Sequence, residues 1–210
     1  MLDATNTKKR ISYHLKHWLY HSEDIFIAVD TENDGKGIIT ELAGMAFTTD
    51  KSRRVEIIDT FHKLTEGVHP SQHSKKPHMS KGNFDAETYT ALIFLDHNKI
   101  QNHEPILIRE FHDWCDKVKQ SINHTSDKKY IFLHWGGSEA KLFGTSEVLD
   151  VAQLYTTWLE HTDQLRSFSL TLEDAVHHLL GMEEVKFVPH RALEDAVMTA
   201  TIFYIILDDI

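Results

Sequence analysis

Two acidic residues, one position apart, end a short apolar run near the start of the chain. Asp30 and Glu32 follow five consecutive apolar residues at positions 25–29. Such a run is typical of a buried strand, along which alternate side chains lie on the same face. Two carboxylates at the end of a buried strand are costly unless their charge is compensated, and oxygen-only ligands suit Mg²⁺ or Mn²⁺. The stretch therefore favours a divalent metal site, with a strand end whose acids simply face water as the alternative.

A third acid, Asp195, lies at the start of a long apolar segment near the other end of the sequence. At helical spacing, its own stripe continues with Met198, Ile202 and Ile206. A second apolar stripe runs beside it, and a helix with two apolar faces is buried. A carboxylate that heads a buried stripe is expected to be a functional ligand, or else a buried acid that is paired with an arginine or serves as a cap.

His190 and Glu139 are two further candidate site residues. Whether each can reach the site depends on its position relative to the neighbouring predicted helix. His190 and Asp195 would lie about 140° apart if both were inside one helix, so they would not share a site. Pro189 favours a loop conformation for the residues before the helix, and this would leave His190 free to swing over Asp195. Glu139 follows a predicted strand and a Gly-Gly turn, at the first turn of a predicted helix. Acids are stabilised at helix N-termini whatever their function, so the position of Glu139 fits both a ligand and a plain helix start.

The elements that must position these residues follow from the apolar periodicity. Strands are predicted at 25–32, 38–47, 55–64 and 130–134, with a passage from strand to helix at 147–160. Helices are predicted at 7–22, 85–99, 104–122 (led by Pro105 near its first turn), from 138, at 170–180 and at 192–207. Three adjacent strands followed by mixed helices and strands indicate an α/β domain with a mixed sheet. The polar segment 65–83 carries Lys75, Lys76 and Lys81, which fit either phosphate contacts or a solvated loop.

Composition limits the classes of protein that fit. The 210 residues predict one domain, 1–210, with an N-terminal helical extension at 1–23 and a core at 24–207. A single cysteine excludes an internal disulfide and a Cys-rich zinc site. No apolar run is long enough to span a membrane, and residues 1–10 lack the apolar segment of a signal peptide. We therefore expect an intracellular protein, cytoplasmic or nuclear and not secreted. The net charge of −10 argues against a broad basic surface for duplex nucleic acid.

Three ordered blocks of this sequence resemble the DEDDh exonucleases, the family of RNase T, oligoribonuclease and polymerase proofreading domains. The blocks are Asp-Thr-Glu at 30–32, His-Trp-Gly-Gly-Ser-Glu at 134–139 and His-Arg-Ala-Leu-Glu-Asp at 190–195. The apolar segment 38–47 resembles the family's second strand, and 150–154 and 169–172 also fall in family order, so that the resemblance covers about 24–207. The family's second block usually reads His-Asn-x-x-Phe-Asp, whereas this chain has Trp135, Ser138 and Glu139 at the last three specified positions. The resemblance implies a ribonuclease-H-like exonuclease fold: a mixed sheet of three antiparallel strands and then parallel strands, flanked by helices.

The resemblance also implies an activity and a role for each candidate residue. It implies a metal-dependent 3′→5′ exonuclease that releases nucleoside monophosphates from the 3′ ends of single-stranded RNA or DNA. Asp30 would bridge two Mg²⁺ or Mn²⁺ ions, Glu32 and Asp195 would complete one ion's site, and Glu139 would hold the other. His190 would be the general base. The alternatives are a degenerate relative that binds nucleic acid or a protein partner without cutting, and a metal-dependent enzyme for another small phosphate ester. The acidic balance favours short or single-stranded substrates or a basic protein partner, and the oligomeric state stays open.

Overall fold

The computed structural model describes residues 25–33, 37–49, 55–65, 97–122, 130–136, 140–144, 147–162, 171–180 and 191–209. The predicted helix at 7–22 lies outside the described residues, as does the lysine-bearing segment 66–83. Among the helices that the structure describes, none combines the length and apolar character that a membrane span requires.

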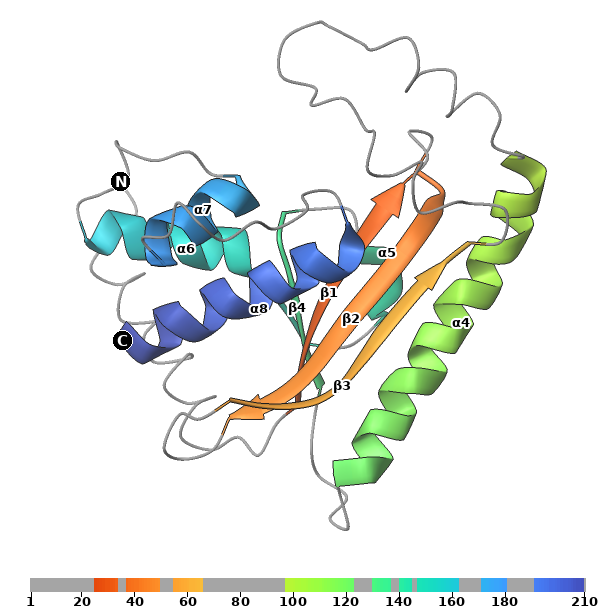
Figure 1. The fold of residues 1–210 in the computed structure, drawn as a ribbon, viewed down its shortest axis with the longest axis horizontal. Coiled ribbons are helices and arrows are strands. Elements are labelled where there is room, and N and C mark those ends of the chain that lie inside the picture. The colour runs from red at the N-terminus through yellow and green to blue at the C-terminus, as the bar shows by residue number, and fades with distance from the viewer. Residues whose placement is uncertain are drawn as a thin grey trace, which may run out of the picture.

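A five-stranded mixed sheet forms the centre of the fold, in the order β3-β2-β1-β4-β5 (Figure 1). Its strands are β1 (Ile25–Asn33), β2 (Ile39–Thr49), β3 (Val55–Leu64), β4 (Tyr130–His134) and β5 (Glu147–Asp150). The first three strands are antiparallel neighbours, whereas β4 runs parallel to β1 and β5 runs parallel to β4. The predicted α/β class and its mixed sheet are therefore confirmed, and all five strands lie where the apolar periodicity placed them.

Helices cover both faces of the sheet, which makes three layers (Figure 1). On one face lie α4 (His97–Ile122) and α5 (Ala140–Phe143); on the other lie α6 (Val151–His161), α7 (Leu172–Leu180) and α8 (Ala192–Asp209). Two apolar clusters, one on each side of the sheet, form the core. The cluster under α8 includes Phe26, Ala28, Met45, Met198, Ile202 and Phe203.

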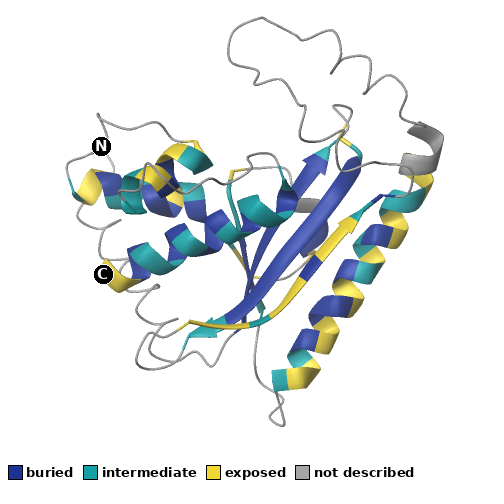
Figure 2. Cartoon of the chain, in the orientation of Figure 1, coloured by how far each residue is buried: buried dark blue, intermediate teal, exposed yellow. Residues whose placement is uncertain are grey.

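Both central strands are buried along most of their length, as Figure 2 shows. Every side chain of β1 from Ile25 to Val29 is at most 1% exposed, and Asp30 is the first residue of the strand that water reaches more than marginally. A strand packed on both faces has little freedom to shift, because its side chains interlock with two helical layers. The acids that follow are therefore held by a strand that is packed on both faces.

The helix predicted to start at 104 begins earlier, so the prediction that Pro105 stands near its first turn was wrong. The structure has one helix, α4, that runs from His97, and Pro105 lies inside it. The last residues of the helix predicted at 85–99 belong to this same helix, whereas 85–96 lie outside the described residues. A proline within a helix costs about 3 kcal/mol because it removes a hydrogen bond and crowds the preceding turn. Here a tertiary contact anchors that turn: the Glu104 carboxylate accepts a hydrogen bond from the Ile39 amide of β2 at 3.0 Å.

Gly44 of β2 lets α4 lie close against the sheet. A β-carbon built at this glycine would lie 2.9 Å from a ring carbon of Phe111 and 3.0 Å from a ring carbon of Trp114. Real β-carbons almost never approach other carbons so closely. The absence of a side chain at position 44 therefore sets the spacing between the helix and the second strand.

Candidate metal centre

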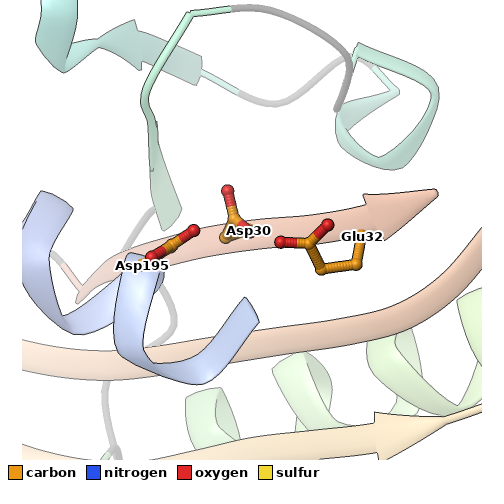
Figure 3. A group of neighbouring side chains, drawn as sticks. All are labelled: Asp30, Glu32 and Asp195. Atoms are coloured by element: carbon orange, nitrogen blue, oxygen red, sulfur yellow. The ribbon is translucent and has the colours of Figure 1, made fainter. Parts of the chain in front are cut away.

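Three of the predicted acids converge in space. Asp30, Glu32 and Asp195 each offer a carboxylate oxygen, and these three oxygens all lie within 4.8 Å of one another. Two come from β1 and the third from the first turn of α8 (Figure 3). The structure thus brings together residues that are far apart in the sequence, at a spacing that suits a shared cation.

The alternation of β1 places its two acids on the face that α8 covers. Phe26 and Ala28 lie on this face and belong to the apolar cluster beneath α8. Asp30 and Glu32 continue the same row, so the row turns from apolar to acidic where the cover of α8 ends. Glu32 remains only 7% exposed. A carboxylate this buried needs compensation, and this excludes the interpretation in which both acids simply face water.

The buried stripe of α8 fixes Asp195. The prediction that Asp195 heads a buried stripe is confirmed, because Met198, Ile202 and Ile206 are each 0% exposed. The helix begins just before it: the Asp195 amide donates to the Arg191 carbonyl at 3.0 Å. The side chain therefore leaves a well-packed helix at its N-terminal turn, where the helix dipole favours negative charge.

Glu139 and His190, the other two predicted site residues, lie outside the described residues. Their neighbours in the sequence are described. β4 pairs in parallel with β1, in a register that sets Leu133 opposite Ala28. The carboxyl end of β4, with His134, therefore reaches the same edge of the sheet as Asp30. On the other side, Arg191 directly precedes α8.

Sequence reasoning missed Glu41, a buried acid beside the three. Glu41 is 0% exposed and lies on β2 directly opposite Glu32. Its Oε1 atom accepts a hydrogen bond from Arg191 Nε at 3.2 Å and lies 2.6 Å from His62 Nε2. Like charges directly opposite each other destabilise a strand pair, and the guanidinium of Arg191 compensates the charge of Glu41. The signal was present: Glu41 is a charged residue inside the apolar segment 38–47, and a charged residue is almost never fully buried without a partner.

Asp150, the first residue of the family-order segment 150–154, ends β5 and caps the next helix. Its Oδ1 atom accepts hydrogen bonds from the amides of Ala152 and Gln153, at 2.9 and 3.3 Å. The amide of Gly136, in the turn after β4, donates to the same oxygen at 3.3 Å. Asp150 thereby ties the segment that leads toward Glu139 to the start of α6.

The donor set of the three converging acids fits a hard divalent cation. Two carboxylates 4.8 Å apart repel by about 3.5 kcal/mol at an effective dielectric constant of about 20, and by about 0.9 kcal/mol in water. The set is oxygen-only and anionic, as Mg²⁺ and Mn²⁺ prefer. Asp30, Glu32 and Asp195 are therefore the residues that would hold such an ion, which would remove their mutual repulsion.

Comparison with known proteins adds no identification. A scan against models of protein families and a search of curated protein sequences both find no match to this chain.

Proposed function

We propose that this chain is a metal-dependent 3′→5′ exonuclease that acts on single-stranded nucleic-acid ends. The observation that carries the proposal is the convergence of Asp30, Glu32 and Asp195 within 4.8 Å. These are three of the five residues that the resemblance to the DEDDh family assigns to catalysis, and they come from two of its three sequence blocks. A chance surface cluster would not be expected to select those same positions.

The arrangement of the sheet supports the finer assignment, a ribonuclease-H-like fold. The resemblance implies three antiparallel strands followed by parallel ones, and the order β3-β2-β1-β4-β5 has this pattern. The first acids lie on the central strand β1 and the last on a helix packed across it. The β4 strand that precedes Glu139 is the parallel neighbour of β1, which leads the second block toward the same edge.

In the proposed reaction, water adds to the last phosphorus, and the bond from that phosphorus to the 3′-oxygen of the penultimate nucleotide breaks. The products are a nucleoside 5′-monophosphate and a strand with a new 3′-hydroxyl. Divalent cations, when bound, supply charge neutralisation at the phosphoryl oxygens and at the leaving 3′-oxygen. Asp30, Glu32, Asp195 and Glu139 would hold them, and His190 would accept the proton of the attacking water. An imidazole suits this task, since its ordinary pKa lies near neutrality.

A labelled oligonucleotide tests the proposal directly. A single-stranded RNA and a DNA of the same sequence, each labelled at the 5′ end, are incubated with the protein and Mn²⁺. The expected result is a ladder of fragments shortened from the 3′ end, absent with EDTA and absent for Asp30→Asn. An intact substrate that shifts in a native gel would instead indicate a binding module. An intact, unshifted substrate of both kinds would refute the proposal.

A further inference from the structure

Two hydrogen bonds link Glu41 to the metal centre. The carboxylate of Glu41 accepts from the side chain of Arg191, Nε to Oε1 at 3.2 Å. The backbone carbonyl of the same Arg191 accepts from the amide of Asp195 at 3.0 Å. One residue thus binds β2 through its side chain and Asp195 through its backbone. Residues 41 and 191 are 150 positions apart, so this link is wholly a product of the fold.

The link lies where it can set the position of α8 over the sheet. Glu41 is fully buried, and the side chain of Arg191 is 19% exposed. Glu41 also faces Glu32 across the strand pair, so its backbone is fixed relative to one of the three converging acids. A bond from Glu41 to the residue that precedes α8 therefore fixes the start of this helix relative to β1.

From this geometry we propose that Glu41 is a positioning residue for the metal centre. Through Arg191 it holds the first turn of α8 so that Asp195 reaches the Asp30–Glu32 pair. This role rests on the proposed function, in that the three acids hold a divalent cation. Glu41 lies outside the group of three converging acids. Its Oε1 atom is engaged by Arg191 and His62.

A positioning role and a purely electrostatic role predict opposite results for the two partners. Glu41→Gln removes a negative charge near the centre, and by charge alone it would weaken cation binding. Arg191→Met removes a positive charge, and by charge alone it would strengthen cation binding. If Glu41 and Arg191 act as one support for Asp195, both variants weaken binding. Groups that hold a metal ligand in place typically change metal affinity by about 10- to 100-fold when they are altered.

The experiment measures the dissociation constant of Mn²⁺ by electron paramagnetic resonance of the free ion. The proteins are the wild type, Glu41→Gln, Arg191→Met, the double variant and a control, Glu110→Gln. Glu110 is a matched control because it too pairs with a basic side chain, Lys63 at 3.0 Å, but on the exposed surface. We expect about tenfold weaker binding in each single variant, a similar loss in the double variant and no change in the control. Tighter binding by Arg191→Met, or wild-type affinity in both single variants, would overturn the positioning role.

A second measurement needs no metal. Amide hydrogen exchange of the first turn of α8 should be faster in Glu41→Gln than in the wild type, with exchange in α6 unchanged. If the wild type bound no Mn²⁺, the proposed function would fail, and the exchange measurement alone would decide whether Glu41 holds α8. Equal exchange in α8 for both proteins would refute that support.

Discussion

Removing one charge from the acidic centre should stabilise the metal-free protein. The change is Asp195→Asn, which keeps the size of the side chain and deletes one of three carboxylates whose oxygens lie within 4.8 Å of one another. Most substitutions at a partly buried position are destabilising. A gain in stability would therefore be strong support for mutual repulsion among these acids.

The magnitude follows from the geometry. Asp195 takes part in two of the three repulsive pairs. These two pairs together cost about 2 kcal/mol with the screening of water and about 7 kcal/mol at an effective dielectric constant of about 20. Asp30 and Asp195 are only half-buried, so the screening of water keeps the cost in the lower half of this range. The lost charge at the helix N-terminus offsets about 0.3–1 kcal/mol. The net gain is then about 1–4 kcal/mol, or roughly 2–16 °C in Tm for a domain of this size.

Thermal unfolding followed by circular dichroism, in low salt, checks this. In EDTA the variant should melt at a higher temperature than the wild type. In millimolar Mn²⁺ the Tm of the wild type should rise, because a hundredfold excess of ion over Kd stabilises the folded state by about 2.7 kcal/mol. The Tm of the variant should rise much less. Glu194→Gln is the matched control, since Glu194 lies in the same helical turn but outside the converging set. It should lose a few tenths of a kcal/mol through the helix dipole. Mutual repulsion and cation binding would both be refuted if Asp195→Asn melted below the wild type in EDTA and Mn²⁺ left the Tm of the wild type unchanged.

Three further predictions concern single residues. His190→Ala should lose most turnover of the oligonucleotide and keep wild-type Mn²⁺ affinity; near wild-type rates would remove its role as the base. Burial, and then the charge of Asp116, raises the pKa of the Cys115 thiol to about 12. A thiol reagent at pH 8 should therefore label this sole cysteine only as fast as the protein unfolds, and prompt labelling of folded protein would contradict this. Burial lowers the pKa of His178 below its ordinary value of 6.5. The unfolded chain then binds this proton more readily, so Tm should fall as the pH drops below about 6.5, and more steeply than in His178→Gln. Equal slopes for the two proteins would rule His178 out as the cause.

The strands could be predicted because each buried strand coincides with a local apolar run in the sequence. The segment 25–29 is apolar throughout, and β1 is buried on both faces there. Pro105 misled the prediction because a proline is a strong local signal for a helix start. In the fold, the turn before this proline is anchored by the bond from Ile39 to Glu104, a contact across 65 positions that no local window contains.

The acids of the site could be predicted as candidate metal ligands, whereas the buried pair of Glu41 and Arg191 beside them could not. Asp30 and Glu32 are revealed by strand alternation, and Asp195 by helical spacing. The proposed positioning role of Glu41 depends on Arg191, just before α8, and only the fold brings Arg191 and His62 of β3 to one oxygen atom. Periodicity shows which face of an element a residue occupies, but it does not show which side chain from another part of the chain it contacts there.

The spread of the acidic centre along the sequence has a consequence for the order of synthesis. A ribosome makes Asp30 and Glu32 early, and a growing chain must extend beyond residue 195 before Arg191 can neutralise Glu41 and Asp195 can join the pair. Until then the nascent chain carries the acids of β1 and β2 without Arg191 and without the third carboxylate of the converging set. Under the proposed function, a chain released before α8 is made would lack Asp195 and would therefore not be expected to cleave nucleic acid.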